Sequence, residues 1–181
     1  VQQAIFQEPG YAQAQAMLGY SWMLTWFRNQ DPSALDAADR EAKRGVLLDP
    51  ADGWCQFVRG YVALYHHRYD EAEEHYDRAI AINPNDVQLI SEMGAFKKYL
   101  GEVEEALDWI RQALRLSPAR NAWIWHEMGL ALITARRPAE ALEAFAKVQP
   151  PLPFDDIYMA ICHAKLGNVA EARALARRVQ M

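Results

Sequence analysis

A period of 34 residues is the feature of this sequence that most restricts how the chain can fold. Gly60 and Gly94 stand 34 positions apart, and each is followed after 12 and 19 residues by alanine and after 24 residues by proline. A third, weaker copy begins at Gly129. The repeated positions are Ala72, Ala79 and Pro84, then Ala106, Ala113 and Pro118, then Ala141, Val148 and Pro153. A fixed period of this length predicts a stack of similar units that bury their apolar faces against their neighbours.

The residue types at these positions favour a pair of packed helices in every copy. Glycine and alanine let two helices approach closely, while larger side chains fill the groove between them. Pro84 is expected to end a second helix, because proline lacks a backbone N–H and disfavours helix in the residue before it. Asp86 can then cap the next helix. Gly101 and Gly167 mark tight turns, where a left-handed backbone costs glycine little.

The stretch W-H-E-M-G-L-A-L at residues 125–132, followed by Ala141 and Phe145, resembles the tetratricopeptide repeat (TPR) pattern W-x2-L-G-x2-Y…A-x3-F. Met128 and Leu132 stand where that pattern has leucine and tyrosine. The resemblance implies an all-α fold, namely an α-solenoid in which helix-turn-helix TPR repeats stack into a right-handed superhelix.

The period divides the chain into one TPR array, residues 1–181, with atypical ends. We expect residues 1–9 to be the end of an upstream repeat, 10–50 a repeat with a long first helix or insertion, 53–86, 87–120 and 121–153 TPR repeats, and 154–181 a terminal helix pair. Because residues 1–9 lack a partner helix and the chain starts with valine, we expect a piece of a longer protein. The alternative is that Val1 to Pro9 form a capping segment.

The repeat at 10–50 departs from the period, since Gly19 precedes Ala38 by 19 residues and not 12. Seven extra residues equal about two helical turns, so part of the insertion can lengthen the first helix through Trp22, Trp26 and Phe27 without rotating its buried face. The remainder, residues 28–33, is expected to be a polar turn around Asp31.

Charge and cysteine content exclude several classes of function. The formal net charge of -5 argues against a nucleic-acid surface, which needs a basic patch. No apolar run approaches the roughly 20 residues that cross a bilayer, and the first residues do not resemble a signal peptide, so we expect no membrane insertion by this chain. We expect a cytoplasmic protein, or a periplasmic one if a longer protein spans a membrane. Cys55 and Cys162 lack metal-ligand spacing and are expected to be buried apolar groups.

Catalytic signatures are missing from the sequence. The five histidines are scattered, and His126-Glu127 lacks the second histidine of an H-E-x-x-H zinc motif. The stretch Asp49 to Gly53 holds one glycine and two acids, which is typical of a capping turn and not of a phosphate-binding loop. We therefore expect no enzyme activity, no cofactor and no metal site.

The candidate partner-binding residues follow from the TPR resemblance, which places the first helix of each pair on the concave side. Counted from each glycine, the inward positions are Tyr20, Trp54, Phe57, Tyr61, Tyr65, Trp123 and His126. Aromatic side chains provide large contact area at small entropic cost, which suits the capture of an extended or helical segment of a protein or peptide. The alternatives are packing between adjacent helices and burial by another copy or domain. The cations that hold a chaperone's C-terminal carboxylate in some TPR proteins are not matched at these positions.

The array as a whole resembles the TPR arrays that follow bacterial class III adenylate or guanylate cyclase domains or winged-helix regulator domains. That resemblance favours a protein-interaction scaffold or sensor module of a bacterial signalling protein. The alternative is an oligomerisation module, a homo-oligomer that brings two catalytic or DNA-binding domains together.

Overall fold

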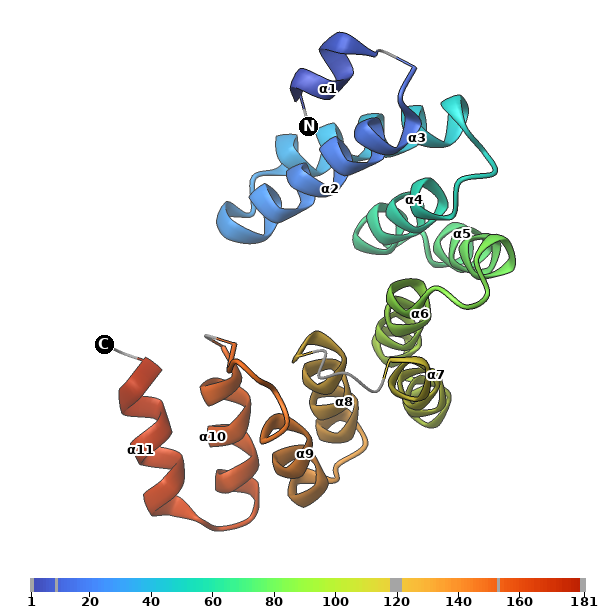
Figure 1. The fold of residues 1–181 in the computed structure, drawn as a ribbon. Helices are drawn as coiled ribbons and strands as arrows, with labels where there is room; N and C mark the ends of the chain where they lie inside the picture. The colour runs from blue at the N-terminus through green and yellow to red at the C-terminus, as the bar shows by residue number, and fades with distance from the viewer. Residues whose placement is uncertain (1, 9, 118–121, 153, 180–181) are drawn as a thin grey trace. The chain divides into compact units, whose positions relative to one another are not determined.

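The computed structural model describes residues 2–8, 10–117, 122–152 and 154–179, and within these ranges the chain forms eleven α-helices and no strand (Figure 1). This confirms the predicted all-α fold of paired helices. The expectations for Val1, Pro9, Pro118 and Pro153 fall outside the described residues. The chain consists of two compact units, residues 1–89 and residues 90–181.

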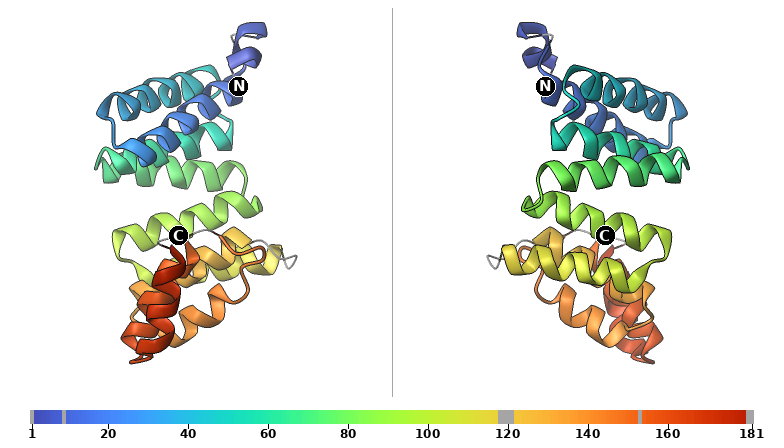
Figure 2. Two further views of the ribbon diagram at one scale, coloured as in Figure 1. Left: turned by 90° about the vertical axis from the view of Figure 1, so that its left-hand side faces the viewer. Right: turned by 90° about the vertical axis from the view of Figure 1, so that its right-hand side faces the viewer.

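The first unit holds two long helices followed by two shorter ones. Its elements are α1 (Gln2–Gln7), α2 (Ala12–Asn29), α3 (Pro32–Leu48), α4 (Gly53–Tyr65), α5 (Tyr69–Ile82) and the first residues of α6 (Val87–Leu100). Helices α2 and α3 form one antiparallel pair and α4 and α5 form the next, and α4 also packs on α2 and α3 (Figure 2). The first helices of these two pairs, α2 and α4, therefore lie beside each other.

The extra residues of the 10–50 repeat lie in its two helices. Helices α2 and α3 contain 18 and 17 residues, against 13 and 14 in α4 and α5. The expected polar turn at 28–33 is shorter than predicted, because α2 continues to Asn29 and α3 already begins at Pro32. Gln30, with a left-handed backbone (φ 55°), ends α2, and the Asp31 carboxylate accepts a hydrogen bond from the Ser33 N–H at 2.9 Å and caps α3.

Small residues bring α2 and α3 into close contact. Ala16, Ala38 and Ala42 are fully buried between the two helices. A Cβ atom added at Gly19 would lie 3.0 Å from the backbone nitrogen of Ala42 and 3.1 Å from the carbonyl oxygen of Ala38. Glycine is therefore required at position 19 by helix packing, because the atoms that face it are backbone atoms that no change of rotamer can move.

A charge network around the buried Arg59 joins α3, α4 and α5. The Arg59 guanidinium of α4 donates to the Asp39 carboxylate of α3 at 2.7 Å and to the Glu71 carboxylate of α5, and Arg68 also pairs with both acids. Burial alone would raise the pKa of Asp39, but hydrogen bonds from Lys43, Arg68 and Arg59 outweigh it and hold that pKa well below its usual range. The ionised carboxylate thus ties the first helix pair to the second.

The second unit continues the same pairing. It contains the rest of α6, then α7 (Val103–Leu116), α8 (Ala122–Thr134), α9 (Pro138–Phe145), α10 (Asp155–Lys165) and α11 (Val169–Val179). Helices α8 and α9 form one pair, α10 and α11 another, and α10 packs on α9 and α8. Gly101 and Gly167 have φ values of +86° and +81°, which confirms the two predicted left-handed turns.

Both cysteines are buried, as predicted. Burial, together with the nearby Asp52 and Asp49 carboxylates, raises the pKa of the Cys55 thiol to about 12, and burial also raises the pKa of Cys162. Both thiols are thus protonated and unreactive at neutral pH. Among the described residues, no helix has the length and apolar character needed to span a membrane, and no group of three or more potential ligands is placed to hold a metal ion.

Candidate partner-binding site

Aromatic side chains of α2 and α4 form one continuous cluster in the first unit, which we call the aromatic face. Its members are Tyr20, Trp26 and Phe27 of α2 and Trp54, Phe57, Tyr61 and Tyr65 of α4. The residues of α4 recur every three or four positions, so they share one side of the helix. Five of the seven predicted site residues are therefore brought together.

Ring contacts connect the two helices along the length of the aromatic face. The Trp54 and Phe57 rings stack with centroids 4.8 Å apart, and the Tyr20 and Tyr61 rings follow at 5.7 Å. Farther along α4, Phe27 meets Tyr65 at 4.9 Å in an edge-to-face arrangement. Such contacts fix the positions of the rings before any partner arrives, which reduces the entropy lost on binding.

The members of the aromatic face differ in exposure: one ring is buried beneath the others, which are partly exposed. Phe57 is only 1% exposed and packs on Tyr76 of α5 with ring centroids 5.9 Å apart. Phe27 is 39% exposed, and Trp54, Tyr61 and Tyr65 are partly exposed. Phe57, one of the predicted partner-binding residues, thus turns its side chain into the helix pair and supports the accessible rings.

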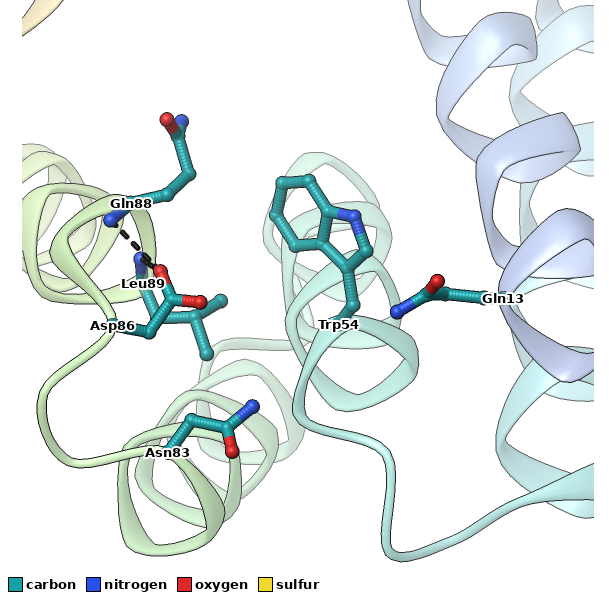
Figure 3. A pocket seen from close by; sticks show the side chains of 6 residues that line it. All are labelled: Gln13, Trp54, Asn83, Asp86, Gln88 and Leu89. Atoms are coloured by element: carbon teal, nitrogen blue, oxygen red, sulfur yellow. Dashed lines mark hydrogen bonds between the residues drawn. The ribbon is translucent and has the colours of Figure 1, made fainter.

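A hollow of about 410 Å³ lies at the Trp54 end of the aromatic face. Its lining residues come from α2, α4, the end of α5 and the start of α6: Gln13, Trp54, Asn83, Asp86, Gln88 and Leu89. Figure 3 shows the Trp54 indole standing between Gln13 on one side and Asn83 and Gln88 on the other. The hollow thus combines one large ring with three side-chain amides, each of which can both donate and accept hydrogen bonds.

Two capping aspartates shape the ends of the helices around this hollow. The Asp52 carboxylate accepts from the Cys55 N–H at 2.8 Å and so begins α4, which places Trp54 in the first turn. The Asp86 carboxylate accepts from the N–H groups of Gln88 and Leu89 at 2.9 and 3.1 Å. The predicted capping roles of Asp86 and of the 49–53 turn are confirmed.

Trp123 and His126, the remaining predicted site residues, belong to the second unit. Trp123 is 37% exposed, but His126 is 3% exposed and surrounded by Trp123, Phe145, Phe154 and Tyr158. His126, a predicted partner-binding residue, therefore lies in the interior of the second unit. Its side chain bonds to the Asp155 carboxylate, with 2.7 Å between Nδ1 and Oδ1, and so fastens the start of α10 to α8.

We expect Asp155→Ala to lower the free energy of unfolding of the second unit by about 2 kcal/mol, because His126 and the Leu152 N–H then lose a buried partner. Amide hydrogen exchange should speed up in α10. The matched control is Asp156→Ala, whose carboxylate pairs with the largely exposed Arg178 and should contribute only about 0 to 0.5 kcal/mol. Equal effects of the two variants would contradict the assigned role of Asp155.

Sequence reasoning missed several members of the site. The sequence predicts Trp26 and Phe27 in the lengthened helix but not at the site, although Phe27 follows Tyr20 by seven residues, a spacing that returns to the same side of a helix. Gln13, Asn83 and Gln88 carry no motif, because amides at helix ends are common for reasons of capping and solubility. Only the packing of α2 beside α4 and the lining of the hollow itself show that these amides lie together.

The fold and this site define a class: a helix-pair repeat protein with an aromatic face on its first helices. The tetratricopeptide repeat family model matches residues 54–86, the pair formed by α4 and α5. The chain is also 32% identical over 90 residues to the Small glutamine-rich tetratricopeptide repeat-containing protein 2 of Mycosarcoma maydis, a match that covers 50% of this chain and 25% of that protein. Residues 54–86 are therefore a TPR, and the sequence resemblance to such repeats is supported.

Solved TPR proteins share the fold. The structure of a thermophilic TPR protein of Thermus thermophilus superposes with a TM-score of 0.79 at 18% identity, covering 93% of this chain and 89% of that one. The structure of YrrB, described as a TPR protein with an unusual peptide-binding site, gives a TM-score of 0.58 at 18% identity over 98% and 89% of the two chains. TPR proteins of this kind generally act as non-enzymatic scaffolds that bind proteins or peptides.

Proposed function

We propose that this chain is a protein-interaction scaffold and that the aromatic face is its partner-binding site. The observation that carries the proposal is the partly exposed, preordered set of rings on α2 and α4, next to a hollow lined by side-chain amides. Large aromatic side chains dominate binding energies at interfaces, and rings already held by neighbours lose little entropy on binding. The peptide-binding site of YrrB, on the same fold, is consistent with this role.

Capture of partners from an extract of the source cells tests this proposal. We expect the double variant Trp54→Ala/Tyr61→Ala to lose a specific partner by roughly 30-fold, the factor that corresponds to removal of a hot spot of about 2 kcal/mol. Quantitative mass spectrometry measures the recovery of each protein. Circular dichroism must show unchanged helix content, since both rings also contact Phe57.

Tyr69→Ala provides the matched control, because Tyr69 is an exposed aromatic residue of the same unit that lies on α5 and outside the aromatic face. This variant should keep every partner. If the double variant retains its helix content and all of its partners, the aromatic face is not the binding site. A separate Trp123→Ala variant measures the contribution of the second unit.

Self-association is a second candidate function, favoured by an apolar groove on the last helix pair. The groove is formed by Ala160, Ala164, Ala172 and Ala176 with Ile161, Val169 and one charged residue, Arg173. Ile161 and Val169 are 40% and 53% exposed. We expect Ile161→Glu to shift any dimer seen by light scattering toward monomer. A strict monomer across concentrations in the unchanged chain would exclude this candidate.

A further proposal concerns the role of the scaffold in the whole protein. The chain spans a quarter of the length of its Mycosarcoma maydis relative, so that relative contains much that this chain does not. We infer from the resemblance to arrays beside cyclase and winged-helix domains that the scaffold serves a bacterial signalling protein. Purification of the full-length protein from its source cells and mass spectrometry of its tryptic peptides would test this inference, and a parent without such a domain would reject it.

A further inference from the structure

We propose that the occupant of the aromatic face is an uncharged, extended segment rich in proline. This inference rests on the proposed function and names the chemistry of the partner. Four features of the first unit carry it: the charge of the site, the arrangement of its rings, its length and the polar groups at its end.

The aromatic face and the lining of the hollow offer no cation to an acidic partner. The seven members of the aromatic face carry no charge at neutral pH, and the lining of the hollow contains no lysine or arginine. Its one ionised group is Asp86, whose carboxylate already accepts two backbone N–H groups of α6. An acidic tail or a free C-terminal carboxylate would therefore lose its hydration without gaining a cation, which is unfavourable.

The arrangement of the rings suits flat, compact side chains. Tyr61 and Tyr65 meet at an interplanar angle of 74° with centroids 5.2 Å apart, and Phe27 and Tyr65 meet at 90°. Rings that turn edge to face produce a ridged surface with ring faces between the ridges, in place of one broad plane. Proline-rich segments dock on aromatic side chains in other peptide-binding domains.

The length of the aromatic face matches a short extended peptide. Trp54 and Tyr65 are eleven residues apart on α4, which corresponds to about 17 Å at 1.5 Å per residue. A polyproline II helix rises about 3.1 Å per residue, so five or six residues cover this distance. An α-helical ligand would need about eleven residues to do the same.

The amides at the Trp54 end distinguish an extended ligand from a helical one. The Gln13 amide nitrogen already donates to the Asp52 carboxylate at 3.2 Å, but the Gln13 carbonyl oxygen can accept from a peptide backbone, and the Asn83 amide can donate to one or accept from it. An α-helix satisfies its own backbone groups over its interior, whereas polyproline II has no internal hydrogen bonds and leaves its carbonyl oxygens available. A proline-rich segment is also preformed in this conformation, so it loses little entropy when it binds.

Calorimetric titration of the 181-residue chain with four synthetic peptides tests the inference. The probes are capped decaproline, a capped glycine-serine peptide of the same length, an acidic peptide with a free C-terminal carboxylate, and an amphipathic helical peptide. We expect saturable binding of decaproline alone, weakened by at least about tenfold in Trp54→Ala/Tyr61→Ala, as loss of a hot-spot contact requires. Tyr69→Ala should bind decaproline like the unchanged chain.

Every other outcome overturns the inference about the partner's chemistry. The scaffold function is judged separately, by the loss of a cellular partner in the double variant. Preference for the acidic or the helical peptide, or failure to bind decaproline, rejects the proline-rich partner. If the double variant nevertheless loses a cellular partner, the scaffold function stands and only the chemistry assigned to the partner falls. Decaproline binding that the double variant retains would show a different site and would also reject the inference.

Discussion

Gly19→Leu is expected to destabilise the first unit more than any surface substitution, by about 3 kcal/mol. Even a single Cβ atom at this position would lie 3.0 Å from the Ala42 nitrogen and 3.1 Å from the Ala38 carbonyl oxygen. A leucine side chain must therefore push α3 away from α2 and open the alanine-lined contact between them. Chemical denaturation followed by circular dichroism measures the loss.

Gly10→Leu is the matched control, because a Cβ atom at Gly10 meets nothing within 4 Å. We expect a change of no more than about 0.5 kcal/mol for this exposed position. Similar losses for the two variants would show that glycine at position 19 matters for a reason other than the approach of α2 and α3.

Asp39→Asn is expected to lower the free energy of unfolding at pH 7 by about 3 kcal/mol, because buried Arg59 loses one of its two carboxylate partners. The pKa of Asp39 is depressed in the folded state, so its stabilising contribution is complete above the unfolded pKa of about 3.9 and declines as the pH falls below that value. The difference between the unchanged chain and the variant should therefore narrow from pH 7 to pH 3.

Asp36→Asn serves as the control for this prediction, since Asp36 is an exposed acid of the same helix. Urea denaturation at a series of pH values measures both variants. A difference for Asp39→Asn that stays constant down to pH 3 would contradict the ion-pair account of the contact between the helix pairs.

The pairing of helices could be predicted because it depends on local chemistry that repeats. Gly60, Gly94 and Gly129 mark first helices at spacings of 34 and 35 residues, and the turns at Gly101 and Gly167 need a left-handed backbone that glycine adopts readily. Glycine at these positions indicates a close approach of two helices or a tight turn, and this inference does not depend on the rest of the chain. The extent of the lengthened helices was harder to predict, because Asp31 and Pro32 form a helix start as readily as a loop.

The composition of the site could be predicted only in part, because helical spacing gives the side of a helix but not the depth of a side chain. Phe57 and Tyr61 lie one turn apart on α4, yet Phe57 turns onto Tyr76 and is buried, while Tyr61 is partly exposed. His126 occupies the position equivalent to Phe57 and is buried by the same packing, with Asp155 as its polar partner. Contacts between successive helix pairs decide how deeply a side chain is buried. These contacts join residues that are far apart in the sequence, so helical spacing does not predict them.

Site-specific photocrosslinking tests the central claim, that the aromatic face binds a protein or peptide partner. A photoreactive benzoylphenylalanine is introduced at position 61, on the aromatic face, and separately at position 69, on α5. After irradiation of source cells, adducts are identified by mass spectrometry. The account predicts a specific protein adduct at position 61 and none at position 69. No adduct at position 61, or the same adducts at both positions, would contradict it.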